Sequence, residues 1–506
     1  MGGNLKATLI AHRDFAISDI DRRLFGAFVE HMGRCVYTGI FEPGHPSADV
    51  KGFRQDVADL TKELGVTIVR YPGGNFLSGY NWEDGVGPVA ERPRRLDLAW
   101  FSTETNAFGV NEFIDWCRKT SVEPMLGVNL GTRGVDEARR FVEYCNHPSG
   151  SQLSELRRKH GYDKPHDVKF WCLGNEMDGP WQIGAKTAHE YGRLAHETAK
   201  VMRWVDPSIE LAACGSSNRE MATYARWEYE VLDHCFDHVD FISLHTYFTN
   251  PHDSTAEFLG NIELLDYFIK EVASIADAVA ATRRSPKRIM LSLDEWNVWY
   301  KARSHSDLRK PGWPEHPRLI EEVYNVEDAL LIGGALITLL NNCDRVKAAC
   351  MAQLVNIIGP IMTEPGGPAW RQTIFHPFAL TARYARGRVL RTLAGSPTYA
   401  GKASPEMPYL RACVTEDETS GQVAIFALNR HLREEMDLDV VLRGFGRDRR
   451  IVTALQVSNP NFKAVNTKDE PNAVIPQPIK TIGIENHAIK AKLPPGSWSV
   501  IVTSAA

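Results

Sequence analysis

The sequence has few cysteines and no excess of basic residues. Nine cysteines are spread over 506 residues with no Cys-x-x-Cys pair. That argues against a disulfide scaffold or a structural zinc site, and it fits thiols kept reduced in a cytosol. Lys and Arg number 58 against 63 Asp and Glu, a net charge of −5. Because binding to nucleic acid normally needs a basic surface, nucleic acid is not an expected partner.

Targeting and membrane segments are also lacking. The first residues, Met-Gly-Gly-Asn-Leu-Lys, contain neither the apolar run nor the cleavage site of a signal peptide, so a cytoplasmic location is expected. The most apolar stretch, Ala329–Leu340, is shorter than the ~20 residues of a membrane span. This stretch therefore predicts a buried helix, and no membrane partner is expected.

Several motifs of cofactor and metal chemistry are missing. There is no His-Glu-x-x-His, no phosphate-binding Gly-x-x-x-x-Gly-Lys and no Gly-x-Ser-x-Gly, and Gly73-Gly74-Asn75 lacks the spacing of a dinucleotide fingerprint. His31, His245 and His376 could gather around a metal with Glu30, but metal sites in barrels generally use more clustered ligands. Neither a cofactor nor a metal is expected.

Strand-like runs alternate with amphipathic helical stretches between residues 21 and 388. Several of the runs are apolar at consecutive positions, as parallel strands are when both faces are covered. Eight strand-then-helix units in series predict a closed (β/α)₈ TIM barrel. The eight strand candidates are residues 24–30, 67–73, 124–130, 168–176, 209–216, 239–247, 288–296 and 347–356. The helix candidates are residues 53–64, 111–120, 135–145, 185–205, 255–282 and 326–341.

The pattern changes after about residue 388. Alternating runs such as 422–429, 436–442 and 497–503 are separated by Gly and Pro turns, without a convincing helix. This predicts an antiparallel β-sandwich, jelly-roll-like. Ala7–His12 is also strand-like and could pair into that second domain. The expected organisation is an N-terminal strand segment over residues 1–20, a barrel over 21–388 and a β-sandwich over 389–506.

Two barrel strands end in carboxylates, at the end of the barrel where reactive residues usually lie. The fourth strand leads to Asn175-Glu176 and the seventh to Asp294-Glu295. Because these strands face each other across the mouth, their carboxyl groups could approach to ~5–5.5 Å, the separation used by retaining glycosidases. One such carboxylate alone is more often a helix cap or a solvated residue. The two together predict a catalytic pair, Glu176 and Glu295.

Asp178 and Asp294 compete for the same roles. Asp178 lies beyond the strand in an Asp-Gly-Pro turn, where it is expected to cap or turn the chain. Asp294 should point opposite to Glu295 by strand alternation, into the barrel wall rather than the mouth. Glu176 and Glu295 therefore remain the predicted pair.

The other strand ends supply polar and aromatic groups. Each alone has a structural explanation; Arg70, for example, could simply pair with Glu30. Converging on one mouth, they resemble a lining that satisfies sugar hydroxyls. These residues are Glu30, His31, Arg70, Asn75, His245, Tyr247 and Gln353. Trp100, Trp299 and Trp313 offer flat faces that either stack on a sugar ring or pack in the core, and the polar loop 301–317 is placed to shape the rim.

Three segments are similar to family 51 glycoside hydrolases. They are Trp-Cys-Leu-Gly-Asn-Glu-Met-Asp-Gly-Pro-Trp-Gln at 171–182, Asp-Glu-Trp-Asn-Val-Trp-Tyr at 294–300, and Val-Arg-Tyr-Pro-Gly-Gly-Asn-Phe at 69–76. The similarity covers essentially the whole chain, including residues 79–88. The resemblance implies a retaining (β/α)₈ α-L-arabinofuranosidase that acts on arabinofuranosyl oligosaccharides. It also implies a metal-independent, intracellular enzyme that assembles as a homo-oligomer, commonly a hexamer.

The resemblance assigns roles to individual residues as well. Glu176 is similar to the family's acid/base, Glu295 to its nucleophile, and Asn175 to the partner of the sugar 2-hydroxyl. Arg70 would steady the nucleophile. The furanose-binding lining would comprise Glu30, Asn75, Tyr247 and Gln353, with Trp100 and Trp299 on the side of the leaving group.

Two alternatives stay open. One is a related retaining glycosidase that acts on a pyranoside, such as a β-xylosidase or an endoglucanase. The other is a non-catalytic sugar-binding protein, although binding alone does not need a second opposed carboxylate. The preferred polymer, branched arabinan or arabinoxylan, is not assigned by the sequence.

Overall fold

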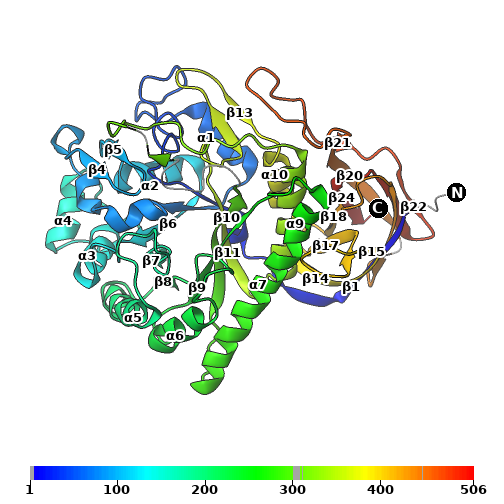
Figure 1. Cartoon of the computed structure of the whole chain (residues 1–506), viewed down its shortest axis with the longest axis horizontal. Coiled ribbons are helices and arrows are strands. Elements are labelled where there is room, and N and C mark those ends of the chain that lie inside the picture. The colour runs from blue at the N-terminus through cyan, green and yellow to red at the C-terminus, as the bar shows by residue number, and fades with distance from the viewer. Residues whose placement is uncertain (1–4, 300–307, 310, 447, 506) are drawn as a thin grey trace.

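The computed structural model describes residues 5–299, 308–309, 311–446 and 448–505. Its main body is a closed barrel of eight parallel strands, beside which lies a curled sheet (Figure 1). Each of the eight predicted barrel strands is present, so the predicted (β/α)₈ architecture is confirmed. The barrel strands are β2 (Gly26–Phe28), β3 (Ile68–Tyr71), β6 (Glu123–Val128), β7 (Phe170–Leu173), β8 (Glu210–Ala213), β9 (Phe241–Phe248), β10 (Met290–Val298) and β11 (Val346–Ala352).

The barrel strands are buried on both faces. All four residues of β3 and all four of β7 are buried, because one face looks into the barrel and the other is covered by helices. In chain order β7 is the fourth strand and β10 the seventh. The two predicted catalytic carboxylates therefore come from the strands that the sequence assigned to them.

Helices surround the barrel and close its outer face. The six predicted helices are α1 (Gln55–Leu64), α2 (Val110–Thr120), α3 (Val135–Asn146), α5 (Ala188–Val205), α7 (Thr255–Thr282) and α9 (Val326–Asn341). In the described part of the chain, three further α-helices were not predicted: α4 (Gln152–Lys159), α6 (Arg226–Cys235) and α10 (Phe375–Tyr384). These three are short, and α6 and α10 start without a side-chain cap, so the usual start signals are weak.

The second part of the chain is a ten-stranded sheet that curls around its own core. Its order is β21-β20-β24-β18-β17-β14-β1-β19-β23-β22. Strand β1 (Leu5–Asp19), at the N-terminus, pairs with it as the sequence predicted. The remaining strands are β14 (Arg388–Gly395), β17 (Leu410–Asp417), β18 (Gln422–Asn429), β19 (Met436–Arg443), β20 (Arg449–Ser458), β21 (Gln477–Pro478), β22 (Ile482–Glu485), β23 (Ala488–Leu493) and β24 (Ser497–Ala505).

One pairing in this sheet departs from a purely antiparallel arrangement. β1 is antiparallel to β14 and parallel to β19. Since β14 and β19 thus run in opposite directions, a strand inserted between them can be antiparallel to only one. The sheet is mostly antiparallel, as predicted, with this single exception among its described pairs.

Strand β18 shows how the sheet joins the barrel. Val423, Ile425 and Ala427 belong to the core enclosed by the curled sheet. The alternate residues, Phe426 and Leu428 among them, belong to the large core that continues into the barrel. Because successive side chains of a strand point to opposite faces, β18 has one apolar face toward the core of the curled sheet and one toward the core shared with the barrel.

Helix α9 lies between the barrel and the curled sheet (Figure 1). Fifteen of its sixteen residues are buried, which explains why it is apolar all round, as a helix covered on every side should be. A Cβ added at Gly333 would lie 2.3 Å from Trp498 Cδ1, and one added at Gly334 2.2 Å from Ile262 Cδ1. The buried helix predicted at 329–340 is confirmed. Among the described residues, no helix combines the length and apolarity required of a membrane span.

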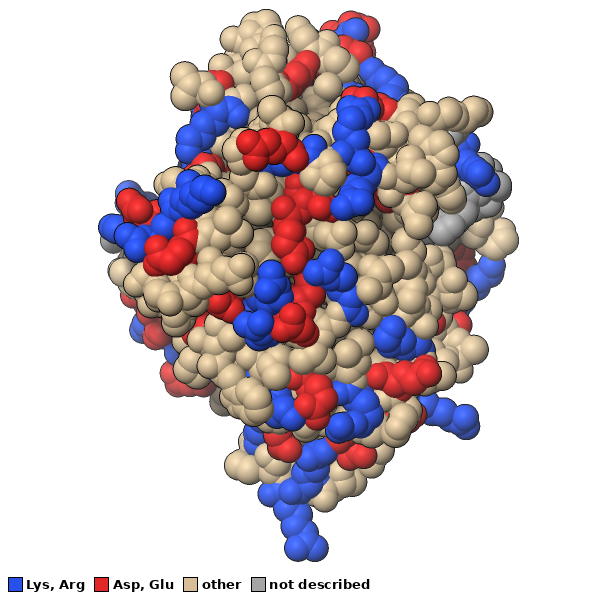
Figure 2. Space-filling model, turned by 90° about the vertical axis from the view of Figure 1, so that its left-hand side faces the viewer, with Lys and Arg blue, Asp and Glu red and all other residues tan. Residues whose placement is uncertain are grey.

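Charged side chains of both signs are intermixed over the face of the molecule seen in Figure 2. Neither sign forms a broad field there, in keeping with the near-balance of 58 basic and 63 acidic residues. This face therefore offers no extended basic surface for a polyanion.

Candidate active site

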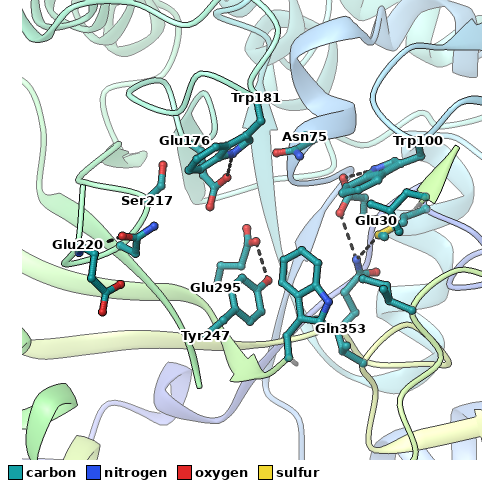
Figure 3. A pocket seen from close by; sticks show the side chains of 16 residues that line it. Glu30, Asn75, Trp100, Glu176, Trp181, Ser217, Glu220, Tyr247, Glu295 and Gln353 are labelled. Atoms are coloured by element: carbon teal, nitrogen blue, oxygen red, sulfur yellow. Dashed lines mark hydrogen bonds between the residues drawn. The ribbon is translucent and has the colours of Figure 1, made fainter. Parts of the chain in front are cut away.

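A cavity of about 310 Å³ opens where the barrel strands end (Figure 3). Eight of the eleven predicted site residues line it, and the other three, Arg70, Asn175 and His245, lie behind its wall. Among the described residues, the wall is formed by Glu30, Met32, Asn75, Trp100, Glu176, Trp181, Ser217, Asn218, Glu220, Tyr247, Glu295, Trp299, Leu308, Ile320, Gln353 and Ile358.

Glu176 and Glu295 meet across this cavity. Glu176 follows β7 by three residues, and Glu295 lies within β10. Three atoms lie within 4.8 Å of one another: a carboxylate oxygen of Glu176, a carboxylate oxygen of Glu295 and a ring nitrogen of His245. Both glutamates are 8% exposed. Such a separation suits a nucleophile and an acid acting on one bond, and it is shorter than the ~6.5–9.5 Å that leaves room for an intervening water.

Glu295 is held by two donors. Tyr247 donates its hydroxyl to Oε1 at 2.7 Å, and Arg70 Nη1 donates to Oε2 at 2.9 Å. Burial raises the pKa of Tyr247 well above its usual range, and the charge of Glu295 adds to this, so the phenol remains a donor. Both contacts fix the direction in which the carboxylate points. The sequence left open that Arg70 pairs with Glu30. Arg70 instead contacts Glu295, and its Nη2 donates to Asn175 Oδ1 at 2.6 Å.

Glu176 has different partners. Trp181 Nε1 donates to its Oε2 at 2.6 Å, and His245 Nδ1 lies 3.1 Å from its Oε1. Burial raises the pKa of Glu176, and the nearby charge of Glu295 raises it further, although His245 and Trp181 act in the opposite direction. The net effect keeps a proton on Glu176 at higher pH, which is what a general acid requires. Its φ of 43° is rare for a residue with a side chain.

His245 lies behind the two glutamates rather than in the cavity wall. Its Nδ1 is also 3.5 Å from Glu295 Oε2, and its Nε2 is 2.9 Å from Asp294 Oδ1. Burial lowers the pKa of His245, but the charge of Glu295 and the contacts with Asp294 and Glu176 outweigh burial and raise it to about 10. The imidazole is therefore a cation beside three carboxyl groups, and it contributes to the charge balance of the pair.

The two rival aspartates lie outside the cavity wall. Asp294 is 1% exposed and accepts hydrogen bonds from His245 and from Ser292 Oγ at 3.2 Å. Burial raises the pKa of Asp294, but the charge of Arg70 outweighs it, so the pKa lies below its usual value. Asp178 accepts from the backbone N–H of Ser217 at 3.1 Å. Asp294 thus supports His245 beneath the mouth, and Asp178 fixes the turn after β7 to the loop after β8.

Glu30 marks the other end of the cavity (Figure 3). It accepts hydrogen bonds from Phe76 N at 3.0 Å, Trp100 Nε1 at 2.8 Å and Gln353 Nε2 at 3.1 Å. Burial and the charge of Glu295 raise its pKa to about 8. A Cβ added at Gly74 would lie 2.6 Å from Glu30 Oε2. The Gly-Gly pair before Asn75 therefore leaves room for this carboxylate.

Asn175 connects several predicted residues behind the wall. Besides accepting from Arg70, its Nδ2 lies 3.2 Å from Gln182 Oε1 and 3.5 Å from Asn75 Oδ1. These contacts hold Asn75 and Asn175 side by side. The metal grouping considered in the sequence does not form, because His31 bonds Glu104 and Tyr71 whereas His245 bonds the glutamates.

Part of the wall was not predicted from the sequence. Trp181 is five residues beyond Glu176, within the quoted motif, but nothing in its spacing shows that its N–H reaches the carboxylate. Ser217, Asn218 and Glu220 follow β8, a predicted strand that ends in no reactive group.

Trp313 is not among the lining residues; its ring lies 6.1 Å from that of Phe101. Tyr300 and residues 301–307 and 310 of the predicted rim loop lie outside the described residues.

The barrel and the two buried glutamates on its fourth and seventh strands place the chain in a class, the (β/α)₈-barrel glycoside hydrolases. Comparison with known proteins makes the assignment more specific. Residues 60–266 match the α-L-arabinofuranosidase 1 domain and residues 294–497 the α-L-arabinofuranosidase C-terminal domain. The chain belongs to the family 51 α-L-arabinofuranosidases.

Three relatives illustrate the similarity. An intracellular exo-α-(1→5)-L-arabinofuranosidase of Halalkalibacterium halodurans is 54% identical over 98% of this chain and 99% of its own length. A Bacillus subtilis enzyme of the same description is 53% identical over 98% of each chain. A solved family 51 α-L-arabinofuranosidase from Bifidobacterium longum is 43% identical, with a TM-score of 0.95 over 99% of this chain and 100% of that one.

Proposed function

We propose that this protein releases terminal, non-reducing α-L-arabinofuranosyl residues from oligosaccharides, with retention of anomeric configuration. Glu295 is the nucleophile and Glu176 the acid/base. The observation that carries this proposal is the approach of the two carboxylates within 4.8 Å in one cavity. The different partners of the two glutamates support the division of roles.

The reaction has two displacements. Glu295, aimed by Arg70 and Tyr247, attacks the anomeric carbon while Glu176 gives its proton to the departing oxygen. Glu176 then takes a proton from water, which attacks the same carbon and releases arabinose and Glu295. Each step inverts the anomeric centre, so the configuration is retained overall.

The sugar is oriented by groups on both sides of the pair. Glu30, Asn75 and Gln353 present carboxylate and amide groups to the arabinofuranose, and Asn175 lies beside Asn75. Trp100 and Trp299, both lining the cavity, add apolar faces. Polar groups that meet the furanose hydroxyls would discriminate against a sugar of another ring size, because a mismatched ring leaves buried groups unpaired.

Arabinan or arabinoxylan oligosaccharides are the proposed substrates. Three relatives above 50% identity are named exo-α-(1→5)-L-arabinofuranosidases, and one from Bifidobacterium longum at 48% is named exo-α-(1→6)-L-arabinofuranosidase. Since relatives of such similar identity carry names with different linkages, the proposal extends to the sugar released and leaves the linkage open.

We further propose that the enzyme acts in the cytoplasm as a homo-oligomer, by family resemblance a hexamer. Several relatives carry "intracellular" in their names. Leu96 and Leu98, each 56% exposed, are apolar side chains that a neighbouring subunit could cover. Light scattering after size-exclusion chromatography measures the assembly, and a monomer would contradict it.

A substrate panel followed by NMR tests the function. Aryl α-L-arabinofuranoside should be hydrolysed faster than the matching β-xyloside and β-glucoside, and the first arabinose released should carry the α configuration. A higher rate on the glucoside would favour the pyranoside alternative. No arabinose from an arabinan oligosaccharide would favour the sugar-binding alternative, and initial release of the β anomer would contradict retention.

A further inference from the structure

A second group of imidazole and carboxylate side chains lies where α5 and α6 pack together on the outside of the barrel. His189 is near the start of α5, and Glu230 and His234 are one turn apart on α6. His189 Nδ1 lies 3.0 Å from His234 Nε2 and 3.7 Å from Glu230 Oε1. One ligand atom of each residue lies within 4.8 Å of the other two. None of these residues takes part in the cavity described above.

These separations suit a transition-metal ion. Zn²⁺ bonds imidazole nitrogen and carboxylate oxygen at about 2.0–2.2 Å, so two ligands of a tetrahedral ion lie about 3.3 Å apart. The distances of 3.0 Å and 3.7 Å fall on either side of that value. Two imidazoles and one carboxylate are also a ligand set that zinc accepts, with water in the fourth position.

Helix packing fixes one of the histidines. A Cβ added at Gly192 of α5 would lie 2.8 Å from His234 Cδ2 and 3.0 Å from its Cβ, so glycine lets the ring lie against α5. His196 Nδ1 lies 2.9 Å from the carbonyl oxygen of His234. The rings of His189 and His234 are 4.7 Å apart at 79°. Their facing nitrogens are thereby held together before any ion arrives.

The two facing ring nitrogens, His189 Nδ1 and His234 Nε2, are already in a donor–acceptor contact. In the contact between the two rings, one nitrogen donates a proton to the other. An ion that binds both nitrogens takes the place of that proton, which moves to the far nitrogen of its own ring, so that both imidazoles stay neutral ligands.

We propose that His189, Glu230 and His234 form a Zn²⁺ site that joins α5 to α6. The ion would bind the folded chain and cross-link two helices that carry no residue of the proposed catalytic pair. Its role is to stabilise this part of the barrel wall, and the reaction itself does not involve it.

Calorimetric titration of metal-free protein with zinc chloride tests the site. Wild type should bind one ion here, and His189→Ala or His234→Ala should weaken that binding ~10-fold or more, because each removes one of three ligands. Glu230→Ala should weaken it too. His238→Ala is the matched control, since its ring, three residues beyond the end of α6, faces His196 of α5 at 4.7 Å without a carboxylate of the cluster. Zinc should raise the melting temperature of wild type and His238→Ala but not of His234→Ala.

The competing location is the catalytic cavity, where Glu176, His245 and Glu295 are also close. Zinc binding that survives His189→Ala and His234→Ala but disappears in Glu176→Gln would overturn the proposal. So would the absence of any zinc binding to wild type. His189 is an exposed side chain and Glu230 a half-exposed one, so their variants should fold and keep the test decisive even if His234→Ala does not. Cu²⁺ in place of zinc should give an EPR spectrum with two nitrogen ligands.

Discussion

Glu176 and Glu295 are the same residue type, equally buried in one cavity, and their neighbours distinguish them. Glu295 receives a guanidinium N–H from Arg70 and a phenol O–H from Tyr247. Glu176 receives an indole N–H from Trp181 and the imidazole of His245. Two carboxylates with separate partners can hold different protonation states, which is the requirement of an acid beside a nucleophile.

Substitution of each glutamate should affect different substrates. Glu295→Ala should abolish turnover of every arabinofuranoside, because no group remains to attack the anomeric carbon. Glu176→Ala should slow natural oligosaccharides by ~10²–10⁴-fold but affect an aryl substrate with a good leaving group much less. Steady-state rates across leaving groups of graded pKa measure the difference. An equal loss on natural and activated substrates in Glu176→Ala would contradict the assignment.

The pH profile should report the charge on His245. The contact with His245 lowers the pKa of Glu176, and the reaction needs Glu176 protonated in the free enzyme. His245→Gln removes the positive partner, so the pKa of Glu176 should rise. The alkaline limb of the kcat/KM profile should then move to higher pH, and the rate should fall as well. A limb that stays in place or moves to lower pH would contradict this role, and His196→Gln on the outer wall should leave the limb unchanged.

Among the elements, α9 joins the two parts of the fold. It packs against α7 on one side and the curled sheet on the other, and its two adjacent glycines allow both approaches. Trp498 of β24 and Ile262 of α7 occupy the space that side chains at Gly333 and Gly334 would need. The helix therefore sets the distance between the barrel and the sheet.

A single methyl group on α9 should be costly. Gly333→Ala places a Cβ 2.3 Å from an indole carbon, and the strain should lower the free energy of unfolding by about 1–3 kcal/mol, even though alanine favours helix. Chemical denaturation measures this. Gly260→Ala on α7 is the control, because its Cβ would meet the flexible Met407 side chain at 3.2 Å. Equal stability of the two variants would contradict close packing at α9.

The elements themselves were largely readable in the sequence. Fully buried barrel strands have continuous apolar runs, and helices such as α7 have long amphipathic patterns, so both were predicted close to their observed bounds. α6 was not predicted; it begins after Ala225, whose side chain cannot cap a helix. The direction of β1 relative to β19 was also unpredictable, since it depends on which strands β1 lies between.

The site residues could be predicted only where a reactive side chain lies at the end of a strand or just after it. Glu176 and Glu295 could be found because the order of the strands places them on opposite sides of one mouth. Trp181, Ser217 and Glu220 lie in loops whose path depends on tertiary packing. His245 was placed at the right strand, yet its position behind the glutamates depends on Asp294 beneath it. The His189–His234 contact joins two different helices, so no local sequence pattern predicts it.

For the whole molecule, the two parts of the chain are connected three times. β1 starts the chain in the curled sheet before the barrel begins, β14 leaves the barrel for the same sheet, and α9 is buried between them. We propose boundaries near residues 20 and 388, but the two bodies share one continuous apolar core. They should therefore fold as a single cooperative unit.

Truncation tests this unity. A chain of residues 21–388 should be insoluble or aggregated, because removal of the sheet exposes the apolar face of α9 to water. Soluble yield and circular dichroism measure the outcome against the full chain. A soluble, active barrel alone would contradict the shared core and show that residues 1–20 and 389–506 are dispensable for folding.

Glu295 is the residue proposed to form the covalent bond to the sugar. A mechanism-based cyclitol or fluorinated arabinofuranoside, incubated with the enzyme and followed by proteolysis and mass spectrometry, locates that bond directly. The label should lie on the peptide that carries Glu295 and should be absent from the Glu295→Ala variant. A label on Glu176, on Glu30 or on any other residue would contradict the account.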